Sequence, residues 1–148
     1  MRRVACAAIC LCVAALAGCG GDGDEQSWPG PPDPAADGTV AVDGFNTYAE
    51  SVDASWEGSA ALAAGEFLRL DERTAARTTI EATASPEGTG PETVVVTLDG
   101  LADDSVRAER WTLRLEPDGD VFTLTEARWA QRCQPGRGHQ DFSPELCV

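Results

Sequence analysis

Residues 106–130 read VRAERWTLRLEPDGDVFTLTEARWA, and this stretch decides the fold. Apolar and polar residues alternate on both sides of its centre, as they do in strands that bury one face. The central sequence EPDG, residues 116–119, has Pro and Gly in an order that favours a turn. We therefore predict two antiparallel strands, over 106–116 and 121–130, joined as a hairpin.

Two breaks in this alternation predict β-bulges. Ala108 has the opposite parity from Trp111, and a bulge near residues 109–110 would bring both side chains to one face. Leu124 and Trp129 differ in the same way, which predicts a second bulge or a strongly twisted end in the returning strand.

Two earlier segments continue the strand pattern. The sequence TVVVTLD at residues 93–99 is rich in β-branched residues and is the best strand of the chain. Another strand is expected from Thr78 to Ala84, where a Pro- and Gly-rich loop over 85–91 ends it. With the hairpin, these segments predict four antiparallel strands.

Two helices are predicted before the strands. Apolar residues recur at three- and four-residue steps over 41–54, which is the period of one helix face. A second helix is expected over 59–71, with Ser59 as its N-cap and an Ala-rich face that permits close packing. Gly58 separates the two helices.

A sheet with one buried face must be covered, and these helices are the available cover. We therefore predict an α+β domain in which N-terminal helices pack on a curved four-stranded antiparallel sheet. In its order of elements the chain resembles cystatin-like and NTF2-like domains. That resemblance implies a fold and assigns no functional residues.

The N-terminus carries a separate pattern. Arg2 and Arg3 precede an uncharged apolar run over 4–16, and the sequence LAGC follows at residues 16–19. This pattern resembles the signal peptide and lipobox of bacterial lipoproteins. The resemblance implies export, cleavage before Cys19, lipidation of the Cys19 thiol, and anchoring in the cell membrane or outer membrane, facing the periplasm or exterior. The alternative is an uncleaved transmembrane helix, but the apolar run is shorter than the roughly 20 residues that such a helix needs.

Three regions follow from this interpretation. Residues 1–18 are the signal peptide, and residues 39–148 form a single α+β domain. Residues 19–38 are expected to be the lipidated Cys followed by a disordered tether. That segment is rich in Gly, Pro and Asp and has Trp28 as its only large apolar residue, so it buries too little surface to fold.

The chain is strongly acidic, with a formal net charge of −14 from 25 Asp and Glu against 11 Arg and no Lys. Loss of Arg2 and Arg3 with the signal peptide makes the mature chain more acidic still. Nucleic-acid binding needs a basic surface, so DNA and RNA are excluded as expected partners. A solvated acidic surface is the simpler interpretation, and a cation-attracting surface is the alternative.

Cysteine usage predicts one disulfide. Four cysteines are removed with the signal peptide or lipidated: Cys6, Cys10, Cys12 and Cys19. Cys133 and Cys147 remain in an exported chain, where disulfides form. The alternatives are a metal site that includes His139 and a redox pair. A metal site needs three or four ligands and the chain has a single His, while the redox motif Cys-x-x-Cys is missing. No cofactor is therefore expected.

The C-terminal segment QRCQPGRGHQDFSPELCV, residues 131–148, is too rich in Gly and Pro for a regular element. Its run Cys-Gln-Pro-Gly-Arg-Gly-His-Gln-Asp-Phe and its final Cys resemble the closing segment of a family of small uncharacterised exported bacterial proteins. That resemblance implies no activity. The expected structure is a loop that the Cys133–Cys147 disulfide staples to the last strand.

This loop holds the densest group of functional side chains: Arg132, Arg137, His139, Gln140 and Asp141. Arg137, between two glycines, suits binding of a carboxylate or phosphate, and His139 beside Asp141 suits proton transfer. The structural interpretation is different. In it the arginines pair with local acids, His139 bonds to the backbone, and Phe142 fixes the loop to the sheet.

Two further groups are open to a functional and a structural interpretation. The first is an aromatic set that forms either a binding platform or part of the core: Trp56, Trp111 and Trp129. The second is an acidic set that suits either Ca²⁺ or turn-forming bonds to its own backbone: Asp99, Asp103 and Asp104. The spacing of the acidic set matches no EF-hand loop.

Two functional hypotheses follow. The first is a non-enzymatic interaction or small-ligand-binding domain, held at the membrane by the lipid on Cys19. Its candidate binding residues are Arg137, His139, Asp141, Trp111 and Trp129. The second is an NTF2-like hydrolase or isomerase that uses His139 and a nearby Asp as acid and base. The first is preferred because the sequence has no motif for a catalytic set.

Overall fold

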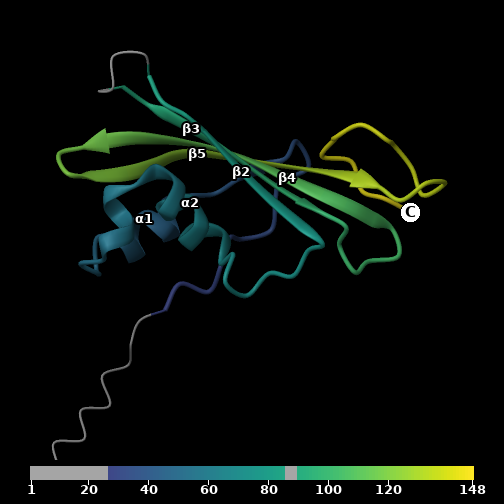
Figure 1. Ribbon diagram of the computed structural model, residues 1–148, viewed down its shortest axis with the longest axis horizontal. Coiled ribbons are helices and arrows are strands. Elements are labelled where there is room, and N and C mark those ends of the chain that lie inside the picture. Colours follow the sequence, from purple (N-terminus) through teal and green to yellow (C-terminus); the bar gives the residue numbers. More distant parts are fainter. Residues whose placement is uncertain (1–26, 86–89) are drawn as a thin grey trace, which may run out of the picture.

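The structure, a computed structural model, describes residues 27–85 and 90–148 (Figure 1). This part of the chain has an α+β fold with two α-helices and a five-stranded antiparallel sheet. The elements are β1 (Thr39–Val40), α1 (Asp43–Ala49), the 3₁₀ helix η1 (Ser55–Gly58), α2 (Ala60–Leu68), β2 (Arg77–Thr83), β3 (Glu92–Asp99), β4 (Val106–Asp118) and β5 (Val121–Cys133). The predicted fold class is confirmed. The predicted strand count is wrong, because β1 adds a short strand.

The sheet is a meander with β1 added at one edge. Its strands lie in the order β1-β5-β4-β3-β2, and all neighbours are antiparallel. The predicted hairpin of β4 and β5 is present. Its turn lies slightly later than expected, because Asp118 still pairs with Val121. Gly119 makes this tight turn with a φ of 64°, which glycine adopts without strain.

Both long strands contain a register shift. The shift in β5 lets Leu124 and Ala127 both face the core, as the predicted second bulge requires. The shift in β4 lies between Val106 and Ala108, earlier than predicted. No shift separates Ala108 from Trp111, so these two buried side chains lie on opposite faces of the sheet. Ala108 is buried on the face that the helices do not cover.

The helices cover one face of the sheet, near the turn between β4 and β5 (Figure 1). Phe67 and Leu68 of α2 are fully buried in a core that includes Val94 and Val96 of β3. Ala residues on the inner side of α2 are also buried, which permits the close packing that the sequence predicted. Ser59 caps α2 as expected, because its side chain accepts a hydrogen bond from a backbone N–H of the first turn.

Both helices are shorter than predicted. α1 ends at Ala49, where the hydroxyl of Ser51 donates to the carbonyl oxygen of Tyr48 at 2.6 Å. Such a bond competes with continuation of the helix. α2 ends at Leu68 because Arg69 adopts a left-handed conformation with a φ of 50°.

Residues 28–38, which we name the strap, pack against the domain where a disordered tether was expected. Trp28 is only 7% exposed, and its indole N–H donates to the carbonyl oxygen of Phe67 at 2.8 Å. Its ring also contacts Phe45. These contacts offset the ordering cost, so the folded part begins near Trp28 and not at residue 39. The signal peptide, Cys19 and the rest of the expected tether lie outside the described residues.

Candidate functional site

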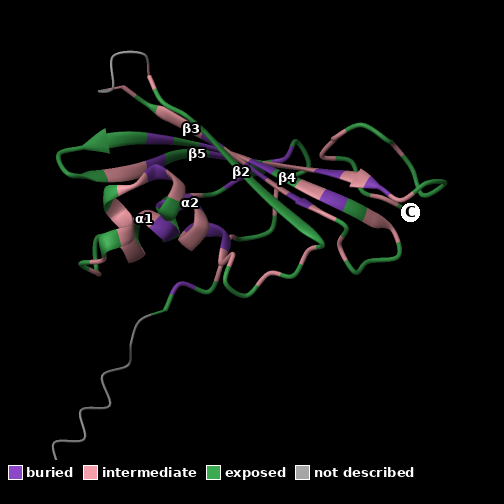
Figure 2. Cartoon of the chain, in the orientation of Figure 1, coloured by how far each residue is buried: buried purple, intermediate pink, exposed green. Residues whose placement is uncertain are grey.

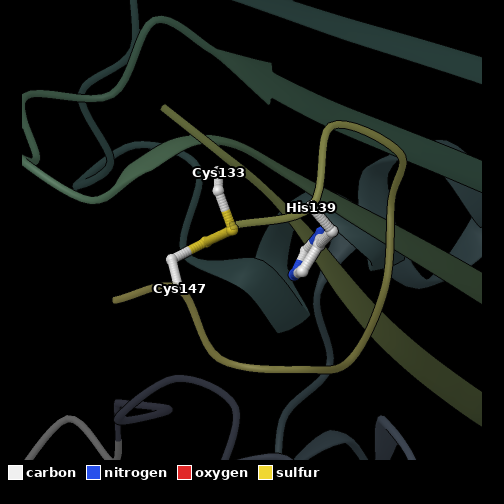
Figure 3. Close-up of side chains that lie close together, drawn as sticks. All are labelled: Cys133, His139 and Cys147. Atoms are coloured by element: carbon white, nitrogen blue, oxygen red, sulfur yellow. A yellow bond between two sulfur atoms is a disulfide. The ribbon is translucent and has the colours of Figure 1, made fainter. Parts of the chain in front are cut away.

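A disulfide-closed loop follows β5, at the end of the sheet away from the helices (Figure 1). Cys133, the last residue of β5, is bonded to Cys147, and their Cα atoms lie 5.4 Å apart (Figure 3). The backbone N–H of Cys133 also donates to the carbonyl oxygen of His139 at 3.1 Å. The predicted disulfide is confirmed. We name residues 134–147 the stapled loop.

His139 lies in the stapled loop with each ring nitrogen beside a backbone carbonyl oxygen. Nδ1 is 2.8 Å from the oxygen of Asp141, and Nε2 is 2.9 Å from the oxygen of Glu145. Carbonyl oxygens only accept hydrogen bonds, so both ring nitrogens must carry a proton to make both bonds. The bonds to Glu145 and then Asp141 therefore favour the imidazolium and raise the pKa of His139 above its ordinary value of 6.5.

We expect the protein to lose stability as the pH rises through the pKa of His139. A group whose pKa is raised on folding stabilises fully below its unfolded value of about 6.5, and that contribution is lost above its folded value. Urea unfolding at about pH 5.5 and 8 should therefore differ, and His139→Gln should reduce the difference. Because the chain has one His, its NMR titration is unambiguous. A midpoint at or below 6.5 would contradict this assignment.

Gln131 holds the same segment of the stapled loop. It is only 3% exposed, and its side-chain amide donates to the carbonyl oxygen of Glu145 at 2.8 Å. Its backbone exchanges hydrogen bonds with Ser143. The Glu145 oxygen therefore accepts from both Gln131 and His139, which fixes residues 143–146 along the edge of β5.

Cys133, His139 and Cys147 bring possible metal ligands within 4.8 Å of one another (Figure 3). A metal ion needs thiolates and an unprotonated imidazole nitrogen. Here both sulfur atoms are joined in the disulfide, and both imidazole nitrogens face carbonyl oxygens. The arrangement therefore suits a structural loop better than the metal-site alternative.

The arginines of the tail have different roles. Arg132 pairs with Asp99 at 3.2 Å, and its guanidinium lies 5.1 Å from the ring centroid of Phe142. Arg110 lies over the same ring at 3.9 Å. Phe142 is thus held on the sheet face opposite the helices, as the structural interpretation expected. Arg137, by contrast, is exposed in the stapled loop.

Of the acidic set, Asp103 makes local bonds on the β3–β4 connection. Asp103 accepts hydrogen bonds from the backbone N–H groups of Val106 at 2.6 Å and Ser105 at 2.8 Å. These bonds lower the pKa of Asp103, with that from Val106 as the larger cause. Asp99 is directed instead to Arg132. The geometry matches the turn-forming interpretation for Asp103, whereas Asp99 forms an ion pair with Arg132.

The three tryptophans lie in different environments. Trp56 packs against Tyr48 beside the helices, with ring centroids 6.2 Å apart. Trp111 is 3% exposed, and its indole N–H donates to Glu109 at 3.2 Å. Trp129 is half-buried. They do not form one platform. Trp56 and Trp129 are both partly exposed, and Trp129 is the one that lines a groove.

A groove of about 500 Å³ opens beside Trp129, between the strap and the stapled loop. We name it the Trp129 groove. Its lining residues are Asp33, Pro34, Ala35, Ala36, Trp129, Pro144, Glu145 and Leu146. The backbone N–H of Trp129 donates to the carbonyl oxygen of Gly38 at 2.8 Å, and Gln131 bonds to Ser143. Both walls are therefore attached to the same edge of β5.

A second hollow, of about 250 Å³, is lined by Trp111 and Trp129 together with strap residues and an ion pair. The pair is Arg73 with Glu109, whose charged atoms lie 2.8 Å apart. His139 does not line this hollow. The structure thus does not bring His139 into a common pocket with these two tryptophans.

Sequence reasoning found Trp129 but missed the walls of its groove. One wall belongs to the strap, which was expected to be a disordered tether. The other, Pro144–Leu146, belongs to a C-terminal segment whose charged residues had suggested function. One signal was available. Trp28 is the single large apolar residue in a polar segment. Leaving such a side chain in water is unfavourable, so it tends to pack against the folded domain.

Comparisons with models of protein families, with curated proteins and with solved structures find no match to this chain. Within residues 27–85 and 90–148, no helix has the length and apolar character that crossing a membrane requires.

Proposed function

We propose that this chain is a cell-envelope lipoprotein whose domain binds an apolar, positively charged small molecule in the Trp129 groove and catalyses no reaction. The observation that carries the proposal is the half-exposed Trp129 ring in a groove whose two walls are fixed to β5. A preformed, largely apolar concavity with few polar groups is the usual form of a small-molecule site.

Charge favours a cation as the ligand. The two ionisable residues of the groove are Asp33 and Glu145, both exposed carboxylates. The whole chain has a formal net charge of −14, which attracts cations and repels anions. The face of an indole ring also attracts cations. Apolar contact with Trp129 and attraction to the carboxylates would therefore act together.

Tetraphenylphosphonium and tetraphenylborate test this proposal, because they have the same shape and opposite charges. We expect the phosphonium to bind and to quench tryptophan fluorescence, with at least about tenfold higher affinity than the borate. Trp129→Ala should weaken binding about tenfold, and the double variant Asp33→Asn/Glu145→Gln should remove most of the charge preference. Asp104→Asn removes an exposed carboxylate elsewhere and should change neither result.

Isothermal titration calorimetry gives the same affinities without relying on the fluorescence of the residue that is changed. Equal binding of the two probes would contradict the cation preference. Phosphonium binding that is unchanged in Trp129→Ala would show that the Trp129 groove is not the site.

The membrane part of the proposal rests on the N-terminal sequence. The basic start, the apolar run over 4–16 and the sequence LAGC at 16–19 are the parts of a lipoprotein signal in their usual order. A lipidated Cys19 would then precede the folded part by only the residues up to Trp28. Two acyl chains on the glycerol would give a stable anchor, since each buried methylene contributes about 0.8 kcal/mol.

We expect Cys19→Ala to abolish incorporation of radiolabelled palmitate and to release the protein from the membrane fraction. The reason is that thioether lipidation needs the Cys19 thiol. Cys12→Ala is the matched control, since it changes a cysteine inside the signal peptide and should leave labelling intact. Labelled, membrane-bound Cys19→Ala protein would disprove the lipoprotein assignment.

The order of helices and strands is similar to that of cystatin-like and NTF2-like domains, and we propose this relationship for the fold. The alternative function, an NTF2-like hydrolase or isomerase using His139 and a nearby Asp, has less support. Both nitrogens of His139 are engaged by carbonyl oxygens, and the carboxylate of Asp141 is not its partner. A general base needs a free nitrogen within reach of its substrate.

A further inference from the structure

Among the residues that the structure describes, β2 is an open edge of the sheet, whereas the opposite edge is covered. Along β5, β1 pairs with residues 127–128, and Ser143 bridges to Gln131. Every residue of β2 is exposed (Figure 2), and the large apolar side chain of Ile80 is 45% exposed. A strand of this kind is a template for pairing with another strand.

The direction of backbone hydrogen bonding shows which groups of β2 are free. In an antiparallel sheet this direction alternates along each strand. Gln131 bonds outward to Ser143, so its register partner Glu109 on β4 bonds toward β3. Leu98 on β3 faces Glu109 and bonds toward it, so its own backbone groups point away from β2. Thr78 on β2 faces Leu98, and its backbone groups therefore point to the open side. The outward-bonding residues of β2 are thus Thr78, Ile80 and Ala82.

β2 carries two charged side chains, Arg77 and Glu81. Arg77 and Glu81 are exposed, and neither belongs to a salt bridge within residues 27–85 and 90–148. They lie four residues apart on one strand, roughly 13 Å, which is too far for them to pair with each other. Their side chains share the sheet face opposite the helices, because both have the opposite parity from Ile80, whose partner is the buried Val96.

We propose that two copies of this chain pair through β2, antiparallel and about a two-fold axis at Thr79. Each Arg77 then lies opposite Glu81 of the other copy, and Thr78 exchanges backbone hydrogen bonds with Ile80 of the other copy. Opposite charges at facing positions stabilise a strand pair. The two sheets join into one, and the Trp129 groove, at the far edge of each sheet, stays open.

The neighbouring registers lack this match of charges. A pair centred on Thr78 or Ile80 leaves each charge opposite a neutral residue. A pair centred on Glu81 sets two carboxylates against each other, and like charges at facing positions destabilise the pair. The centre at Thr79 is therefore the favoured register among those in which the free backbone groups meet.

Cysteine trapping tests the register, because Thr79 faces itself across the axis. The Cα atoms of such a non-hydrogen-bonded pair lie about 4.5 Å apart, within the roughly 4.4–6.8 Å that a disulfide spans. In the full chain, with the cysteines of residues 1–19 replaced by Ser, Thr79→Cys should form a covalent dimer under mild oxidation. It should do so at least about tenfold faster than the equally exposed control Thr83→Cys, which keeps both Arg77 and Glu81.

Equal trapping rates at Thr79→Cys and Thr83→Cys would overturn the register, and no dimer at Thr79→Cys would overturn the pairing. Charge exchange in the Thr79→Cys chain then tests the ion pairs. Arg77→Glu and Glu81→Arg each bring like charges together and should slow trapping about fivefold. An equal mixture of the two variants regains both Arg–Glu contacts and should form the mixed dimer at about the original rate. A mixture that is as slow as its components would overturn the proposal.

Discussion

Replacing Trp28 with Ala is expected to remove about 3–5 kcal/mol from the free energy of unfolding. The ring is 7% exposed and contacts Phe45 and Phe67, and its N–H donates to the Phe67 carbonyl oxygen at 2.8 Å. The Ala variant loses this packing and this bond, and it leaves a cavity between the strap and the helices. Since small domains have only about 5–15 kcal/mol in total, the variant should be close to unfolding. Urea unfolding followed by circular dichroism measures the loss.

Trp28→Phe is the matched control for this experiment. It keeps most of the apolar contact and loses the hydrogen bond, so a smaller loss of about 1 kcal/mol is expected. If Trp28→Ala lost no more than about 0.5 kcal/mol, as ordinary surface substitutions do, the strap would contribute little. The tether would then extend to residue 38, as its composition alone suggested.

The double variant Cys133→Ser/Cys147→Ser is expected to lose about 2–4 kcal/mol and to keep its fold. The disulfide joins residues 14 positions apart, and closing a loop of that size stabilises by about 3 kcal/mol in the chain-entropy description. Gln131 and His139 both hold the carbonyl oxygen of Glu145 without the disulfide. Guanidinium unfolding should therefore show a single, weakened transition and not a detached loop.

Two outcomes would contradict this account of the disulfide. Free thiols at both positions, in protein that is purified from its own host and denatured without a reductant, would refute the bond itself. An unchanged melting temperature after reduction would leave the bond in place but remove its stabilising role. Hydrogen exchange at Ser143 separates global weakening from local release, because its N–H is bonded to Gln131.

Much of the fold could be predicted from the sequence, because these elements depend on the pattern of residues close together in the chain. The strand alternation of residues 106–130 and the β-branched run over 93–99 gave β3, β4 and β5 to within a few residues. The disulfide was predicted because Cys133 and Cys147 are the two cysteines that the signal-peptide interpretation leaves unassigned. The cap at Ser59 was also readable, since a capping side chain bonds within its own first turn.

The rest depends on contacts between distant parts of the chain. β1 is only Thr39–Val40, and such a short strand has no periodicity of its own. The burial of Trp28 depends on Phe67, which lies far away in sequence. The role of His139 was open between proton transfer and backbone bonding, because the sequence does not show which carbonyl oxygens fold back toward a ring. The Trp129 groove likewise exists only where the strap and the stapled loop meet.

The covered edge of β5 has a consequence for the order of folding. It is completed by β1, which precedes the helices, and by Ser143, which follows the last strand. β1 therefore has no partner until β5 has been made, and β5 stays partly open until Ser143 has followed it. Contacts between such distant segments form slowly. A chain that emerges N-terminus first, from a ribosome or an export channel, can complete this sheet only after almost all of the domain is outside.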